Sequence, residues 1–158
     1  MHPSSALIPH EPVLVQLLSG DELEQAKCFL KSLQKNQQKE ILKLLASSEL
    51  DNKDSELTNR LLSNSTYFAE KEILGILNYT LDSHALKIAL TSSPFQVLPA
   101  AGRASRESFT YGCSILLPQQ LETNFIEFPG HHGGYNSEVH HEFAEKLHDV
   151  ICRNRGEN

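Results

Sequence analysis

The first half of the chain carries apolar residues at helical spacing. Between Leu23 and Leu33 they stand three or four residues apart, and a capping-box pattern at 19–22 precedes them. Leucines and isoleucines continue at similar spacing from 36 to 90, in short groups separated by polar clusters. This pattern predicts an amphipathic helix followed by several short helices over 19–90.

The pattern changes in the second half, where short apolar runs predict strands. Short apolar runs stand at 5–9 and 95–101, and residues 124–128 alternate between apolar and polar. Helical patterns fill 105–120 and the segment that Ser137 caps. Strands and helices in this order indicate a parallel sheet with right-handed crossovers. The predicted fold class is therefore α/β, with about three parallel strands and flanking helices.

Composition and charge exclude several classes of protein. The 158 residues are 39% hydrophobic, which suits one compact domain with a modest core. A net charge of −6 argues against a nucleic-acid partner, because binding phosphates requires clustered Lys and Arg. No apolar run is long enough to span a membrane, and the N-terminus lacks a leader pattern. We therefore expect no membrane partner. Cys28, Cys113 and Cys152 are widely spaced, so we also expect reduced thiols and a cytoplasmic protein.

The most distinctive segment is Phe128-Pro-Gly-His-His-Gly-Gly-Tyr135, between the last predicted strand and the last predicted helix. Its glycines allow tight turns and close approach of a ligand, and an imidazole titrates near neutrality and can transfer protons. We therefore predict that His132 is a catalytic base. The residues expected to line its site are Gly130, His131, Gly134 and Tyr135 of this segment, together with Ser105 and Glu107.

Two motifs resemble the C-terminal part of the α/β-hydrolase fold. Phe128-Pro-Gly-x-His132-x-Gly-Tyr135, followed by Glu142-Phe-Ala, is similar to the histidine loop and final helix of small bacterial and fungal members. His10-Glu-Pro12, followed by Leu17-Leu18, resembles their strand just after the nucleophile helix.

The resemblance implies how the whole chain is organised. Residues 1–158 would form a C-terminal portion of an α/β-hydrolase domain. Residues 19–90 would be an inserted helical lid, and 94–155 would run strand, helix, strand, histidine loop and helix. The first strands and the nucleophile are then expected before Met1.

The same resemblance implies Ser-His-acid chemistry, with His132 as the base. The usual position of the acid, after Gly102, matches Ser105, which carries no negative charge at neutral pH. Some family members place the acid after the strand that follows the nucleophile, and that position matches Glu11. Glu11 is therefore the preferred acid, and Glu107 is the second choice.

No nucleophile is evident in the sequence. The Gly-x-Ser-x-Gly elbow does not occur in the 158 residues. Ser105 and Ser114 lack the flanking glycines of an elbow, so neither is expected to replace it.

His10 and the pairs His131/His132 and His140/His141 suggest a zinc site, because imidazole is a common zinc ligand. No His-Glu-x-x-His pattern is present, and adjacent histidines seldom bind one ion. No metal or other cofactor is therefore expected.

Two functions remain open. The complete fold is expected to hydrolyse an ester or a similar bond in a small molecule, and this chain, without the elbow, is expected to be inactive alone. The alternative is a non-catalytic protein-interaction module derived from a hydrolase. Self-association through an exposed sheet edge is a further expectation, because an unpaired strand attracts other chains.

Overall fold

The structure is a computed structural model that describes residues 6–35, 56, 60, 64, 67–93 and 95–155. Most of the helices expected between 36 and 66 lie outside the described residues. The chain divides into two compact units. One consists of Met1–Leu18 and Leu81–Asn158, and the other of Ser19–Thr80.

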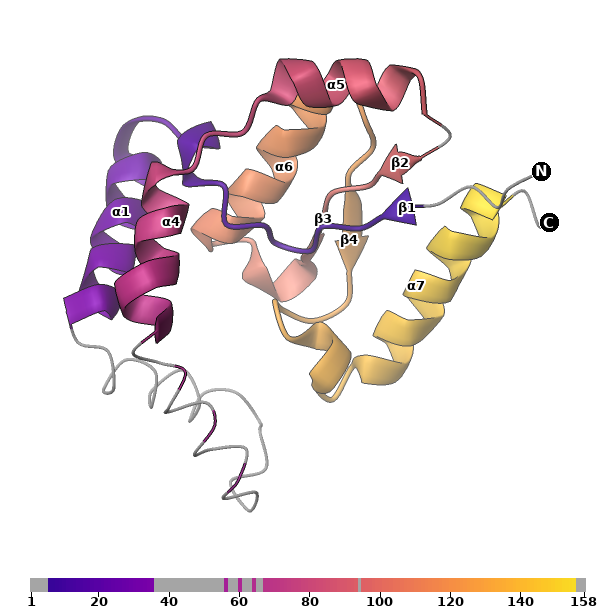
Figure 1. The fold of residues 1–158 in the computed structure, drawn as a ribbon. Coiled ribbons are helices and arrows are strands. Elements are labelled where there is room, and N and C mark those ends of the chain that lie inside the picture. The colour runs from indigo at the N-terminus through magenta and orange to yellow at the C-terminus, as the bar shows by residue number, and fades with distance from the viewer. Residues whose placement is uncertain are drawn as a thin grey trace. The chain divides into compact units, whose positions relative to one another are not determined.

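The first unit contains two short parallel strand pairs (Figure 1). Strand β1 (Ala6–Leu7) pairs with β2 (Gln96–Val97), and β3 (Ala100–Gly102) pairs with β4 (Ile126–Phe128). The chain is therefore a mixed α/β protein with short parallel strands, as predicted. Its finer assignment to the α/β-hydrolase fold stays a prediction.

The expected strand over 95–101 is interrupted at Pro99. Proline has no N–H to donate to a ladder, so β2 ends and β3 begins on either side of it. The Pro99 carbonyl nevertheless accepts the Ile126 N–H at 2.9 Å, and the Ala100 N–H donates to the Pro9 carbonyl at 2.9 Å. Backbone hydrogen bonds therefore join three parallel segments on both sides of Pro99. They include a parallel bridge between His10 and Ala100.

Three helices accompany these strands, and side-chain caps fix two of their starts. Asp82 Oδ1 accepts the Ala85 N–H at 2.8 Å before α5 (Ser83–Thr91). Ser108 Oγ accepts the Tyr111 N–H at 3.2 Å before α6 (Phe109–Leu121). The helix expected over 105–120 therefore starts later, after a 3-10 turn at Arg103–Ser105. The last helix, α7, spans His140–Arg155.

In the described part of this unit, two clusters of buried side chains contribute to the core. Val97, Leu117 and Leu121 make one, against which Leu86 and Leu90 of α5 pack. Helix α5 thus belongs to this unit although it lies inside the predicted lid-like range 19–90.

The second cluster lies under the histidine loop and consists of Ala100, Phe128 and Phe143. The rings of Phe128 and Phe143 stack with centroids 4.6 Å apart, which joins β4 to α7. This stacking holds the two elements that flank the loop.

The second unit is helical. Helix α1 (Gly20–Lys35) buries Ala26, Leu30 and Leu33, the face that the sequence pattern predicts. A π-helical turn at Phe68–Glu72 leads into α4 (Ile73–Asn78), and Ala69 and Ile73 are fully buried there. No helix in the described part of the chain is long and apolar enough to cross a membrane.

Candidate functional site

The chain leaves the parallel segments at Glu11, and this residue has an unusual backbone conformation. Its N–H donates to the Ala100 carbonyl at 2.8 Å, so the residue still belongs to the ladder. Its φ is 48°, in the left-handed region that residues with a Cβ seldom adopt. Successive side chains of a regular strand point to opposite faces, and this turn breaks the alternation. His10 and Glu11 can therefore approach the same loop.

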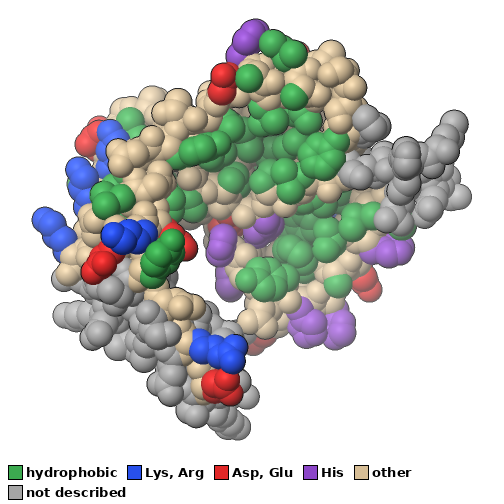
Figure 2. Space-filling view, viewed as in Figure 1, with side chains coloured by type: hydrophobic (Ala, Val, Ile, Leu, Met, Phe, Trp, Pro, Cys, Tyr) green, Lys and Arg blue, Asp and Glu red, His purple; other side chains and the backbone are tan. Residues whose placement is uncertain are grey.

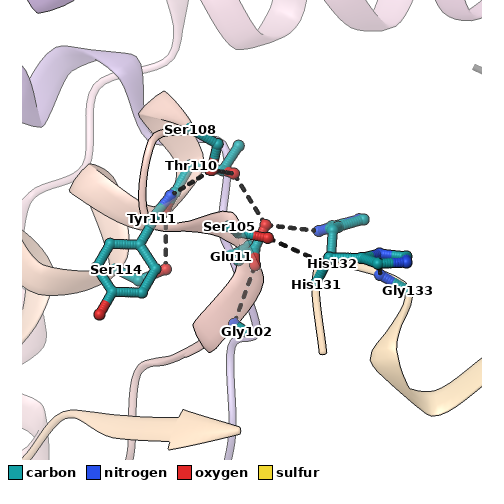
Figure 3. Close-up of polar contacts among 10 residues, drawn as sticks. All are labelled: Glu11, Gly102, Ser105, Ser108, Thr110, Tyr111, Ser114, His131, His132 and Gly133. Atoms are coloured by element: carbon teal, nitrogen blue, oxygen red, sulfur yellow. Dashed lines mark hydrogen bonds and ion pairs between the residues drawn. The ribbon is translucent and has the colours of Figure 1, made fainter. Parts of the chain in front are cut away.

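The Glu11 carboxylate is buried, with a residue exposure of 2%, and is surrounded by donors (Figure 3). The Gly102 N–H donates to Oε1 at 3.0 Å, and the Thr110 hydroxyl donates to Oε2 at 3.0 Å. Burial acts to raise the pKa of Glu11, but hydrogen bonds from His132, Ser105, Gly102 and Thr110 outweigh it and lower the pKa to about 2. The carboxylate is therefore ionised at neutral pH.

Gly102 lets the histidine loop lie directly against β3. A Cβ at this position would lie 2.4 Å from the Gly130 carbonyl oxygen and 2.7 Å from backbone atoms of His131. The Gly130 carbonyl accepts the Ala104 N–H at 2.8 Å, which ties the loop to the same segment. Gly130 itself has a φ of 79°, which favours glycine.

This loop places the His132 imidazole beside Glu11. The backbone N–H of His132 donates to Ser105 Oγ at 3.1 Å, and the ring atom Nδ1 lies 3.4 Å from Glu11 Oε2. Contact with Glu11 raises the pKa of His132, and partial burial opposes that shift. The side chain is 66% exposed, so Nε2, on the other side of the ring, is available to exchange a proton with a reacting group.

His10 is a second imidazole next to this pair. Its ring centroid lies 6.1 Å from that of His132, and it makes edge contacts with Phe128 at 5.8 Å and Phe143 at 5.5 Å. Burial lowers the pKa of His10, an effect that the nearby Glu11 charge partly offsets. Its Nε2 atom is buried and has no hydrogen-bond partner.

The other expected site residues have different surroundings. His131 is exposed, and its Nδ1 accepts the Gly133 N–H at 3.0 Å. Tyr135 is 66% exposed and touches the edge of Phe143. Gly134 is buried, and a Cβ there would lie 2.6 Å from the Pro129 carbonyl oxygen, so the backbone packs closely at this position.

Of the two remaining residues expected to line the site, Ser105 lies in it, and Glu107, the second choice for the acid, does not contact the His132 imidazole. Ser105 is buried and bonds the His132 backbone and the Glu11 carboxylate. Glu107 is exposed in the turn before α6, and the carboxylate beside the His132 ring is that of Glu11. Ser114 is fully buried, and its hydroxyl donates to the Thr110 carbonyl, so it serves the helix.

Sequence reasoning missed three members of this cluster: His10, Gly102 and Thr110. His10 stands next to Glu11, but alternation along a strand would point it away, and only the positive φ of Glu11 changes that. Thr110 lies 99 residues from its carboxylate partner, and no local pattern reports such a contact. Gly102 offered a signal, because a glycine that ends a strand often marks close backbone approach.

Comparison with known proteins gives one informative similarity. The chain is 54% identical over 153 residues to a Bacillus subtilis (strain 168) protein described as "Uncharacterized hydrolase YraK". The aligned part covers 95% of this chain and 56% of that protein, so the chain spans little more than half the length of the relative. No protein-family model and no solved structure matches the chain.

Proposed function

We propose that this chain supplies the acid and the base of a hydrolase active site of the α/β-hydrolase type. The observation that carries the proposal is the buried, ionised Glu11 carboxylate 3.4 Å from Nδ1 of the largely exposed His132 ring. The similarity to a protein named as a hydrolase supports the same general class. The reaction proposed is hydrolysis of an ester or a similar bond in a small molecule.

In this mechanism Glu11 holds the proton of His132 on Nδ1 and stabilises the imidazolium that forms during the reaction. His132 Nε2 then takes the proton of an attacking hydroxyl and returns it to the leaving group. The Nδ1 to Oε2 separation of 3.4 Å is longer than an ordinary N–H···O bond, as catalytic contacts often are before substrate binds.

The attacking hydroxyl is proposed to come from outside residues 1–158, because the sequence has no Gly-x-Ser-x-Gly elbow. Ser105 does not fit this role, since its hydroxyl bonds the Glu11 side of the dyad and the His132 backbone. The isolated chain is accordingly expected to show no hydrolysis that depends on His132.

A chimera provides the test. The aligned 153 residues of the Bacillus relative are exchanged for this chain, and hydrolysis of p-nitrophenyl butyrate is measured. His132→Ala is expected to reduce kcat by several orders of magnitude, and Glu11→Gln by about 10⁴-fold, as for loss of the acid in a serine-protease triad. His141→Ala, which changes an exposed histidine of α7, is the matched control. An active chimera that tolerates His132→Ala would contradict the proposal.

A non-catalytic interaction module is the second candidate, and one observation favours it. Both residues of β1 are exposed, Leu7 by 51%, and among the described strands β1 pairs only with β2. Hydrophobic side chains also gather on the face between α5 and α7 (Figure 2). This candidate predicts a dimer in light scattering that Leu7→Lys converts to a monomer, whereas a monomeric parent would count against it.

A further inference from the structure

We propose that His10, Glu11 and His132 form a binding site for Zn²⁺ or a similar divalent transition-metal ion. One potential ligand atom from each of the three residues lies within 4.8 Å of the other two. Two imidazoles and one carboxylate are a donor set that zinc takes in hydrolytic enzymes. The sequence pattern offered His10 and His132 among possible zinc ligands but not Glu11, and no metal was expected from it, because the three ligands stand in two segments that only the fold brings together.

The spacing of the donors suits a tetrahedral ion. Ligands about 2.1 Å from a tetrahedral zinc lie roughly 3.4 Å from each other. The distance from His132 Nδ1 to Glu11 Oε2 is already 3.4 Å. The remaining donor, on His10, lies at most about 1.4 Å beyond this spacing, the difference between 4.8 and 3.4 Å.

His10 carries the second observation. Its Nε2 is buried without a hydrogen-bond partner, which is uncommon for a polar atom in a folded protein. The edges and faces of Phe128 and Phe143 hold the ring from two sides. Coordination through Nε2 would give this atom the partner that it lacks.

The carboxylate is also prepared for a metal. A ligating carboxylate is usually held by further hydrogen bonds, which fix its orientation. The Gly102 N–H and the Thr110 hydroxyl bind Glu11 in this way, each at 3.0 Å. Three protein donors leave a fourth position open, so water or an anion would complete the coordination.

Metal binding would inhibit the hydrolysis proposed above, and this consequence rests on that function. An ion on His132 Nδ1 displaces the proton that Glu11 is proposed to hold there, and the proton of the neutral ring then lies on Nε2. Nε2 could therefore no longer accept a proton from an attacking hydroxyl. Binding itself does not depend on any hydrolytic activity. The site is therefore an inhibitory metal switch on the same dyad.

Isothermal titration calorimetry with Zn²⁺ tests the binding step. The untagged full chain is used in a Cys152→Ser background, because Cys152 Sγ lies 3.5 Å from His148 Nε2 and offers a separate pair of donors. One Zn²⁺ per chain is expected. His10→Phe keeps an aromatic ring but removes its nitrogen donors, and is expected to weaken binding more than tenfold, since altered supports alone weaken metal sites 10- to 100-fold.

Controls separate this site from other histidines. His141→Phe alters the exposed pair on α7, where the rings of His140 and His141 lie 4.1 Å apart, and is expected to leave the affinity within about twofold. If His10→Phe fails to fold, as judged by circular dichroism, His132→Ala removes another donor at a largely exposed position.

The proposal is overturned if the parent binds no Zn²⁺, or if the folded donor variants bind it as tightly as the parent. Bound Co²⁺ gives an independent readout, because its visible absorption changes when protein nitrogens replace water as ligands. This change in absorption should be absent in the donor variants. No substrate is present in either assay, and the chimera is assayed with a chelator. Failure of the metal site and failure of the hydrolase function are thus distinguishable.

Discussion

Replacement of Glu11 by glutamine tests how much the buried carboxylate contributes to stability. The pKa of Glu11 is about 2 in the folded chain and 4.5 as an ordinary glutamate. A lowered pKa means that the stabilisation is complete above about pH 4.5 and is lost as the pH falls towards 2. A shift of about 2.5 units corresponds to about 3 kcal/mol of unfolding free energy, of which about 2 kcal/mol is gone by pH 3.

The assay is urea unfolding at pH 6 and at pH 3, for the parent, Glu11→Gln and Glu107→Gln. Titration of the other carboxyl groups affects all three proteins alike and cancels in the comparison. Between the two pH values, the parent should lose about 2 kcal/mol more than Glu11→Gln, which has no carboxylate to protonate. Glu107→Gln removes a carboxylate from an exposed turn and should behave as the parent does.

Equal losses in the parent and in Glu11→Gln would refute this reasoning. They would mean that the four donors around Glu11 do not favour its charged form. The carboxylate would then be no more acidic when folded than when unfolded, and its suitability for orienting an imidazole would fall with it.

Four further outcomes follow from the structure. Contact with Glu11 raises the pKa of His132, so an NMR titration of Glu11→Gln should give a lower value than the parent, and an unchanged value would argue against the contact. Gly102→Ala should destabilise the chain by roughly 2 kcal/mol or more, because its Cβ would meet backbone at 2.4 Å. Gly75→Ala, where a Cβ meets nothing within 4 Å, should instead stabilise α4 by up to about 1 kcal/mol in thermal unfolding. Phe128→Ala removes a ring that is 1% exposed and should lower stability by about 3–5 kcal/mol in urea, whereas a loss below 1 kcal/mol would show a loosely packed core.

The sequence predicted the elements of this chain better than their details. Apolar spacing indicated the buried face of α1, and short apolar runs indicated the parallel strands. The break at Pro99 was foreseeable, since proline removes one donor from a ladder. The start of α6 was misplaced, because Ser108 caps the helix and the preceding residues form a tighter turn.

For the site, the sequence named His132 and Glu11, and the structure places their side chains beside each other. The sequence did not predict the surroundings that hold the Glu11 carboxylate in its charged form beside His132. Those depend on a positive φ at Glu11 and on a hydroxyl from Thr110, which come from tertiary packing and have no local pattern. The catalytic roles of the two residues stay predictions that the chimera would test.

The separation along the chain of the groups around Glu11 has a consequence for how the molecule folds. The carboxylate bonds Gly102 across 91 residues and Thr110 across 99. Closing loops of this length precedes any gain from the contacts, so folding that depends on them is slow. The dyad should form only once both parallel pairings are complete, and the His132 environment would then serve as a natural reporter of the last step of folding.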